Sequence, residues 1–389
     1  MTNTEITGSA LIGKSNRSSS INVRMIETVA RTSGVSPLRQ FAEILGLNRR
    51  DTVLGHYEYH RHQVYRPDLN WAEKRAFVGE FGSTRLNLRL APPGLSQMRG
   101  FLSDKLAFTG LMAQLGLPTT RVQAAFGRGR SFGTLRTLRC EADIERFLTT
   151  EARYPLFGKP AQLQQGEGAV WIDGVDTRLG LAQLGNGRTV GLPGLVSEIA
   201  CHAAGGYLFL DVVTQHADLV EMSGGKTLST LRIVTVVAEA DQPQVLYAAW
   251  RLPPPSAMID DFWQDDSLMA EVDIASGQLG ALRRGKGPAS EWLTNHPLHG
   301  APVTGRTLPF WPEAAALAVS AHSIVPISGI LGWDVAISTT GPVLIECNEN
   351  TAHGIYQLAS GRGVLNPDFL PIFAKVAARN TRLIAARKA

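Results

Sequence analysis

The segment at 332–350, GWDVAISTTGPVLIECNEN, constrains the fold more than any other part of this sequence. It consists of two runs of apolar and β-branched residues separated by TTG at 339–341. This pattern predicts two antiparallel strands joined by a three-residue hairpin loop. The residues on either side of the loop, Ser338 and Pro342, then pair with each other. We therefore expect an antiparallel sheet that contains this hairpin.

The predicted pairing places oxygen-bearing side chains on one face of the hairpin. Asp334 lies directly opposite Glu346, and because side chains alternate along a strand, Asn348 shares the face of Glu346. Facing carboxylates repel each other, so the arrangement favours a cation, and such hard oxygen ligands are those that Mg²⁺ prefers. We expect a magnesium site here, with a merely polar, exposed hairpin face as the alternative. Cys347 points to the opposite face and is expected in the core.

Composition limits the class of protein. The 389 residues, 44% of them hydrophobic, suffice for two or three domains. No apolar run approaches the roughly 18 residues that span a bilayer. The polar stretch 1–20 lacks the apolar core of a secretory signal, and we interpret it as a disordered tail. Cys140, Cys201 and Cys347 form neither a disulfide framework nor a metal-binding pair, which favours the cytoplasm.

The first part of the chain is expected to be helical from 21 to 95. Apolar residues recur three and four positions apart, most clearly at 21–33, 37–47 and 71–82. The sequence APPG at 91–94 marks the end of this region. Beyond it, 103–118 reads as a helix that begins after the N-cap Ser103 and is closed by Gly116.

Most of the remaining chain reads as short strands separated by glycines and charged turns. The strand-like runs lie at 154–160, 169–173, 207–213, 231–240, 245–252, 332–338 and 342–348. Helical stretches lie at 193–203, 311–324 and 369–388. The sequence therefore predicts an α+β protein with mostly antiparallel sheets behind a helical N-terminal region.

A glycine-rich turn separates two of the strand-like runs. Lys159 lies at the end of the first run, and QLQQGEG follows it. The glycines allow the backbone amides of Gly166, Glu167 and Gly168 to approach phosphate oxygens, with Lys159 adding a positive charge. An ordinary glycine hairpin is the alternative. The GGKT at 224–227 lacks the upstream glycine of a P-loop, and no GxGxxG follows a strand, which disfavours a dinucleotide-binding fold.

Two arginines interrupt otherwise apolar strands, Arg232 in STLRIVT and Arg251 in YAAWRLP. Charged side chains in such runs are seldom buried without an anion or a carboxylate partner. A phosphate or an acyl-phosphate suits the planar guanidinium group. A structural salt bridge is the alternative.

The order of these features resembles the ATP-grasp superfamily, and more closely its sugar-transfer-associated branch, which is related to α-L-glutamate ligases. The resemblance is carried by LSDKLAF, TLRIVTV and GWDVAI followed by GPVLIECN, and it covers roughly residues 100–370. It implies an ATP-grasp fold, in which two α+β subdomains hold ATP between them. The catalytic core would comprise 96–117 and 214–389, and the lid 118–213. The helical region 21–95 is similar to that branch in character only.

The resemblance implies residues that bind the nucleotide. Lys105 and Lys159 match lysines that contact the ATP phosphates and the adenine edge. The loop at 165–168, which includes Gly166, Glu167 and Gly168, matches the flexible lid over the phosphates. The residues of the strand that pairs with adenine are Leu210, Asp211 and Val212. Asp211 stands where many relatives have Glu, so its contact with the ribose is open.

It also implies residues that act on the reacting groups. Arg232 and Arg251 match positions near the transferred phosphate and the acceptor carboxylate. Asp334, Glu346 and Asn348 match the magnesium-binding positions, in agreement with the hairpin geometry. The implied reaction is ADP-forming ligation with ATP and Mg²⁺, or Mn²⁺ in its place. The γ-phosphoryl group passes to a small-molecule carboxylate, and an amine or another nucleophile attacks the acyl-phosphate.

Two other functions would use the same site: that of a kinase acting on a hydroxyl, and that of a nucleotide-binding protein without turnover. A third alternative, nucleic-acid binding, depends on the charge of the first part of the chain. Residues 1–150 carry 21 Lys and Arg against 12 Asp and Glu, a net charge of +9. This excess suits an anionic partner or a solvated arginine-rich surface. Because no RNA- or DNA-binding signature accompanies it, we expect no nucleic-acid partner. A homodimer is a tendency of the family.

Two further residues are candidates for binding substrate. Asp261 lies in MIDDFWQDDS at 258–267, a departure from the relatives that could bind an amine or a metal or form an acidic surface loop. His353, just beyond the hairpin in NTAHG, is placed to reach substrate, with a plain turn as the alternative. The histidines of HYEYHRH at 56–62 favour packing over a transition-metal site.

Overall fold

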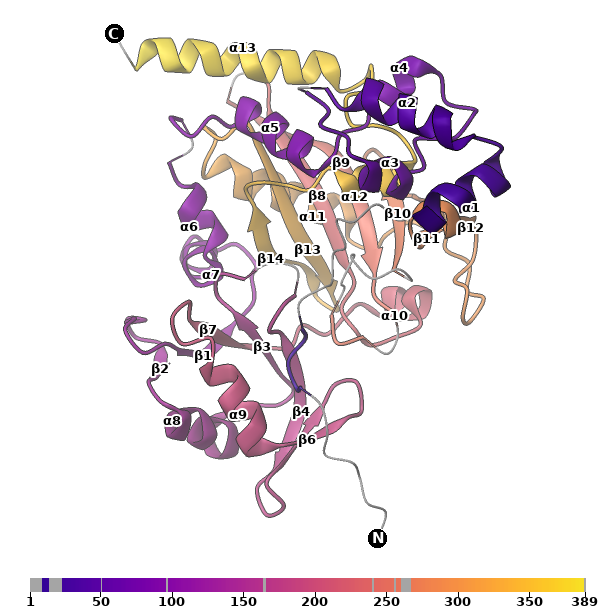
Figure 1. The fold of residues 1–389 in the computed structure, drawn as a ribbon. Coiled ribbons are helices and arrows are strands. Elements are labelled where there is room, and N and C mark those ends of the chain that lie inside the picture. The colour runs from indigo at the N-terminus through magenta and orange to yellow at the C-terminus, as the bar shows by residue number, and fades with distance from the viewer. Residues whose placement is uncertain are drawn as a thin grey trace.

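The structure, a computed structural model, describes residues 9–13, 23–49, 51–95, 97–163, 166–239, 241–254, 257–259 and 267–387. Two seven-stranded sheets organise the chain, one in the lower half of Figure 1 and the other in the upper half. Helices pack against both sheets, and the N-terminal helices lie beside the second one (Figure 1). The predicted α+β class with a helical N-terminal region is confirmed. No helix in these ranges is long and apolar enough to cross a bilayer.

The first sheet has the strand order β2-β1-β7-β3-β4-β5-β6. Its strands are β1 (Val122–Phe126), β2 (Arg136–Leu138), β3 (Leu156–Pro160), β4 (Val170–Asp176), β5 (Leu181–Leu184), β6 (Thr189–Gly191) and β7 (Tyr207–Asp211). Neighbouring strands are antiparallel, except that β1 and β2 are parallel. The helices α8 (Glu141–Arg146) and α9 (Leu192–Ala200), with the π-helical turn Phe147–Glu151, pack on its core, where Ile144 and Phe147 meet Phe209.

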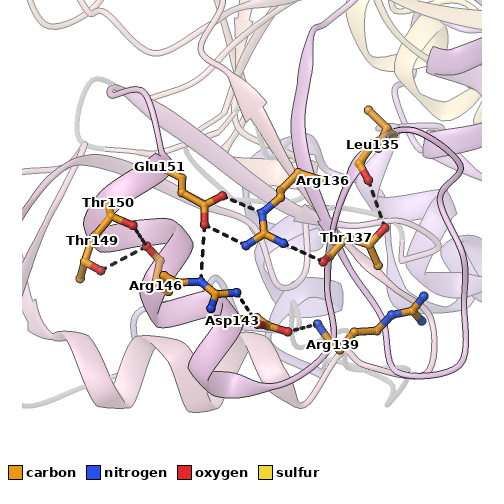
Figure 2. A network of polar contacts seen from close by, with 9 residues as sticks. All are labelled: Leu135, Arg136, Thr137, Arg139, Asp143, Arg146, Thr149, Thr150 and Glu151. Carbon is orange, nitrogen blue, oxygen red and sulfur yellow. Dashed lines mark hydrogen bonds and ion pairs between the residues drawn. The ribbon is translucent and has the colours of Figure 1, made fainter.

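A network of charged side chains joins β2 to α8 and the π-helical turn (Figure 2). The Glu151 carboxylate accepts from Arg136 at 2.6 and 2.8 Å and lies 3.6 Å from Arg146. Asp143 accepts from Arg146 at 2.8 Å and from the backbone N–H of Arg139 at 2.8 Å. Part of the basic excess of residues 1–150 is thus balanced locally, as expected of a solvated arginine-rich surface.

The second sheet has the order β12-β11-β10-β9-β8-β13-β14 and is antiparallel throughout. Its strands are β8 (Thr230–Val237), β9 (Pro243–Leu252), β10 (Leu268–Val272), β11 (Leu279–Arg284), β12 (Glu291–Leu293), β13 (Ile330–Ser338) and β14 (Gly341–Asn348). The helices α6 (Arg99–Ser103), α7 (Lys105–Gln114) and α11 (Trp311–Ser323) pack on one face. The helices α5 (Glu80–Leu90) and α13 (Leu370–Ala386) pack on the other.

The hairpin of β13 and β14 has a shorter loop than predicted. Ser338 pairs with Gly341 and not with Pro342, so the loop has two residues, Thr339 and Thr340. The hydroxyl of Ser338 accepts from the backbone N–H of Thr340 at 3.2 Å and donates to the carbonyl of Gly341 at 2.7 Å. These bonds close the tighter turn, which the prediction did not anticipate.

A bulge in β14 restores the predicted pairing farther along the hairpin. Val335 pairs with Leu344, but the next pair is Asp334 with Glu346, so Ile345 is the extra residue of the bulge. Such a bulge re-aims side chains. Asp334 consequently faces Glu346 as predicted, despite the shift at the loop. Cys347 is buried in the core, also as predicted.

The N-terminal region consists of α1 (Val23–Ser33), α2 (Pro37–Leu47), α3 (His56–Arg61), α4 (Trp71–Arg75) and α5. Its own small core contains Val29, Leu47, Tyr59 and Phe77. The helix predicted at 71–82 is wrong, because residues 77–79 are not helical and separate α4 from α5. The side-chain amide of Gln357 accepts from the N–H of Val78 at 2.8 Å and donates to its carbonyl at 2.9 Å, replacing the helical bonds.

Two predictions about segment ends also need correction. Ser103 is not the N-cap of α7; it ends α6, and Asp104 is the N-cap, accepting from the N–H groups of Leu106 and Ala107. Residues 9–13, predicted within a disordered tail, pack against the first sheet. The carboxylate of Glu198 accepts from the backbone N–H groups of residues 10 and 11, each at 3.0 Å, and this holds the segment in place. The rest of 1–20 lies outside the described residues.

Candidate active site

The largest group of predicted site residues lines one cavity of about 280 Å³ between the two sheets. Nine of the candidates contribute to its wall: Lys105, Lys159, Gly166, Glu167, Arg232, Arg251, Asp334, Glu346 and Asn348. They come from α7, β3, the glycine-rich loop, β8, β9, β13 and β14. Side chains that are up to 243 positions apart in the chain (105 to 348) therefore meet at one place.

Asp334 is the electrostatic centre of this cavity. It accepts from Arg232 at 2.5 and 3.2 Å and from Arg251 at 2.9 Å, and all three side chains are buried. Burial alone would raise the pKa of Asp334, but the two arginines outweigh it and lower that pKa to about 2. The structural salt bridges considered as the alternative for Arg232 and Arg251 are thus present. Their partner, Asp334, itself lines the cavity.

Glu346 and Asn348 remain more accessible than Asp334. The Glu346 carboxylate lies 3.6 Å from the Lys105 ammonium group, and its side chain is 28% exposed. The side-chain amide nitrogen of Asn348 is buried without a hydrogen-bond partner among the described residues. Among the described residues, no group of three or more His, Cys, Asp or Glu side chains is arranged so that it could hold a metal ion. A metal would therefore need the amide oxygen of Asn348, or non-protein ligands, beside the two carboxylates.

Lys159 on β3 supplies a buried positive charge at the same place. It is 8% exposed. Burial lowers its pKa to about 8, although the nearby carboxylates of Glu346 and Asp334 act in the opposite direction. The ammonium form thus still predominates about tenfold at pH 7. An anion bound next to Lys159 would stabilise that form further, so this lysine is suited to contact phosphate.

The glycine-rich loop is held differently from the prediction. Gly166 and Gly168 have positive φ angles of 71° and 76°, which glycine adopts without strain. The N–H of Gly168, however, donates to the carbonyl of Ile12 at 2.8 Å, and the N–H of Ile12 donates to Ala169 at 3.0 Å. The expectation that the Gly168 amide faces phosphate is therefore wrong in this structure. Gly166 and Glu167 line the cavity.

A second cavity of about 110 Å³ adjoins the first. The two share Phe157, Lys159, Thr230, Ile259 and Ile345. Its remaining wall is mainly apolar and includes the three predicted adenine-pairing residues, Leu210, Asp211 and Val212. The Asp211 carboxylate accepts from Gln123 at 2.7 Å and from Arg153 at 3.2 Å, so it is already engaged. The lining suits an apolar group, and Lys159 lies at the boundary between the two cavities.

One of the two substrate candidates, His353, does not line the cavity. His353 is fully buried, and its ring nitrogens contact the Tyr247 hydroxyl at 2.8 Å and the Asn87 side chain at 3.0 Å. Burial lowers the pKa of His353 to about 3. We therefore correct the expectation that His353 contacts substrate: its ring packs in the interior of the protein. Asp261 lies outside the described residues.

Sequence reasoning missed the wall that the N-terminal region contributes. Its lining residues are Tyr57, Glu58, Arg61, His62, Val78, Gly79, Glu80, Ser83 and Thr84. The histidine-rich segment does pack as favoured: the ring of His60 contacts Gln40 at 2.8 Å and the carbonyl of His56 at 2.7 Å. Nothing local in the sequence marks this wall, because it depends on contacts between distant segments: Val78 bonds to Gln357 on α12 (Gly354–Ser360), and Asn87 on α5 donates to the carbonyl of Thr351.

Comparisons with known proteins agree with the motifs. Residues 96–368 match the family described as sugar-transfer associated ATP-grasp. A search of curated proteins finds no significant match. Among solved structures, the chain is similar to the D-alanine-D-alanine ligase from Coxiella burnetii, with a TM-score of 0.41 and 12% identity over 77% of this chain and 62% of that one.

Two further solved structures are similar at the same level. VanG D-Ala:D-Ser ligase from Enterococcus faecalis has a TM-score of 0.40 and 12% identity over 72% of this chain and 61% of that one. Biotin carboxylase from Campylobacter jejuni has a TM-score of 0.39 and 11% identity over 72% of this chain and 46% of that one. The chain thus spans less than two thirds of the length of each of these proteins.

Proposed function

The chain belongs to the sugar-transfer-associated ATP-grasp family, and from this premise we propose that it is an ADP-forming ligase. It would use ATP to activate a small-molecule carboxylate as an acyl-phosphate, which an amine or another nucleophile then attacks. One observation carries the proposal. A single cavity joins two lysines, two arginines and three oxygen-bearing side chains to an adjoining apolar pocket.

The two cavities match the two ends of ATP. The apolar second cavity would take adenine, next to the backbone of 210–212 on and beyond β7. The triphosphate would extend into the first cavity, towards Lys159 and Lys105. Gly166 and Glu167 would cover it from the loop. This assignment leaves the far end of the first cavity for the second substrate.

The residues present fit a magnesium ion in chemical terms. Asp334, Glu346 and Asn348 all line the first cavity, and they provide hard oxygen donors. The amide nitrogen of Asn348 makes no hydrogen bond to another described residue, so it does not fix the orientation of this side chain. We propose that these three side chains hold Mg²⁺, or Mn²⁺ in its place. When bound, the metal would neutralise charge on the β- and γ-phosphate oxygens.

The chain itself would contribute positioning and fixed positive charge. As the substrate carboxylate attacks the γ-phosphorus, the bond to the β-phosphate oxygen breaks and ADP leaves. Negative charge on the transferred group then meets Lys159 and Arg251. Asp334 holds Arg232 and Arg251 in place through short bonds, so their donors are oriented before substrate arrives. Attack of an amine on the acyl-phosphate carbon then releases inorganic phosphate.

The direct test measures ADP release from MgATP over a panel of carboxylates, with hydroxylamine added to trap acyl-phosphate as hydroxamate. ADP and hydroxamate together, for a subset of the panel, are the expected result. ADP with a stable phosphorylated product and no hydroxamate would indicate a kinase. Binding of MgATP without ADP release would indicate a nucleotide-binding protein. Either outcome would overturn the ligase assignment.

The remaining expectations about context are also proposals. Cysteine usage suggests that the reaction takes place in the cytoplasm. The substrates would be small molecules, and the local pairing of surface arginines gives no reason to add a nucleic-acid partner. A homodimer is suggested by the family alone. Analytical ultracentrifugation of the full chain, with and without MgATP, would test it.

A further inference from the structure

The first cavity does not end at the catalytic cluster. Beyond Asp334 and Glu346 it continues to a wall built from the N-terminal region, chiefly α3, the residue that follows it and the start of α5. Arg61 and His62 line this far end, and His62 lies next to Gly354 in the segment after β14. The far end belongs neither to the adenine pocket nor to the phosphate site. It is therefore the part of the cavity available to a second substrate.

The far end carries a positive charge that is largely screened from solvent. Arg61 is 5% exposed, and its guanidinium carbon lies 5.8 Å from the ring centre of Tyr57. His62 is 3% exposed, and its Nδ1 has no hydrogen-bond partner among the described residues. Burial, together with the charges of Arg61, Arg283 and Lys286, lowers the pKa of His62 well below its ordinary value. The ring is thus neutral and surrounded by cations.

A second buried cation stands behind this wall. Arg283 on β11 is fully buried and donates to the Gln63 side chain and to Ser290, each at 2.7 Å. Its Nε and Nη1 have no hydrogen-bond partner in the part of the chain that the structure describes. Two carboxylates, those of Glu58 and Glu80, line the same wall, and Glu58 accepts from the N–H of Glu80 at 3.2 Å and so supports the start of α5. Positive charge at this depth favours an oxyanion.

We propose that the N-terminal region recognises the carboxylate substrate, and that Arg61 binds a second oxyanionic group, a carboxylate or a phosphate, at the end of that substrate remote from the reacting carboxyl. This inference rests on the proposed function. Arg251, beside Asp334, would meet the reacting carboxyl, and Arg61, which lines the same cavity, the remote group. A guanidinium fork binds both kinds of oxyanion through paired hydrogen bonds. The substrate would thus carry two separated negative charges.

The test uses the full chain saturated with Mg²⁺ and the unreactive ATP analogue AMP-PNP. Calorimetry measures the affinity for succinate, glutarate and adipate, each against the monocarboxylate of equal length: butyrate, pentanoate and hexanoate. The corresponding ω-phosphonocarboxylates form a third arm, which distinguishes a remote phosphate from a remote carboxylate. We expect at least one dianion to bind about tenfold or more tightly than its monoanionic partner.

The variants assign that preference to Arg61. Arg61→Ala should abolish the preference for the dianion and Arg61→Lys should retain part of it, while the affinity for MgAMP-PNP is unchanged. Arg75→Ala, which removes an exposed arginine of the same region, should behave as wild type. If Arg61→Ala fails to fold, Thr84→Leu, at a half-exposed position of the same wall, should weaken binding of the dianion by reducing the space.

Two outcomes separate the failure of this inference from that of the proposed function. A protein that binds MgAMP-PNP but prefers no dianion, or keeps its preference in Arg61→Ala, overturns the role of Arg61 and leaves the ligase assignment standing. A protein that does not bind MgAMP-PNP overturns both.

Discussion

Amide replacement of the two facing carboxylates is expected to separate stability from catalysis. Asp334 is 4% exposed and accepts from two buried arginines. Glu346, directly opposite, is 28% exposed at its side chain, and Lys105 lies 3.6 Å away. Both are proposed metal ligands, so Asp334→Asn and Glu346→Gln should each lower kcat by roughly a hundredfold or more. Only Asp334→Asn should also destabilise the fold.

The structure sets the expected difference between the two variants in free energy of unfolding. Lowering the pKa of Asp334 from 3.8 to about 2 corresponds to about 2 kcal/mol of net stabilisation of the carboxylate. Removing the carboxylate also leaves Arg232 and Arg251 buried without it, and breaking such a buried pair costs about 3–5 kcal/mol. The ion pair of Glu346 with Lys105 is partly exposed, and its loss costs about 0–1 kcal/mol.

Urea unfolding followed by circular dichroism measures the stabilities, and ADP release measures turnover. The pH dependence of stability provides a second check on the contribution of Asp334. Because folding lowers the pKa of Asp334, the stabilisation is present above about pH 4 and is lost as the pH falls towards 2. The advantage of the wild type over Asp334→Asn should shrink in the same range. Equal stabilities of Asp334→Asn and wild type at pH 7, or an equal loss in Glu346→Gln, would refute the reasoning.

Three further outcomes are expected. The Kd for MgATP should rise as the pH increases through about 8, because Lys159 then loses its proton, and titration calorimetry of Lys159→Arg should show no such inflection. Gly166→Ala should weaken MgATP binding with little change in melting temperature, since its new methyl group would strain a φ of 71° and clash with Ile259 at the cavity wall. Deleting residues 1–13 should remove the bond from the Gly168 N–H to Ile12, so hydrogen exchange at Gly168 should accelerate strongly while exchange in β13 stays unchanged.

The parts of the fold that the sequence predicted are those with a strong local pattern. The hairpin at 332–348 consists of two runs of apolar and β-branched residues around a turn, and its pairing at Asp334 and Glu346 was correct. The loop length was not, because the bulge at Ile345 leaves no local signal. Short strands such as β2 and β6, of three residues each, carry too few residues for a period to emerge.

The candidate site was predictable on the sheets, on α7 and in the glycine-rich loop, but not at the N-terminal wall. Arg232, Arg251 and Lys159 are conspicuous because charge is rare in apolar strands. The N-terminal wall has no such contrast, since Arg61 lies among other charged and aromatic residues in a short helix. His353 was misjudged for a related reason: its place after the hairpin suggested access, whereas Tyr247 and Asn87, distant in sequence, enclose its ring.

The unit that builds the site extends beyond the segment that defines the family. The family match begins at residue 96, yet α5, which ends at Leu90, packs on the second sheet through Leu86 and Leu90. Asn380 on α13 donates to the carbonyl of Leu90 at 2.7 Å, and Asn87 donates to the carbonyl of Thr351 at 2.9 Å, beside the cavity. Thr351 lies three residues beyond β14, the strand that bears the proposed metal ligands Glu346 and Asn348. The helix α5 therefore contacts the proposed metal site's neighbourhood and also contributes Ser83 and Thr84 to the cavity wall. The N-terminal region therefore belongs to the same packed unit as the candidate site, and the substrate recognition proposed above rests on residues that precede the matched segment.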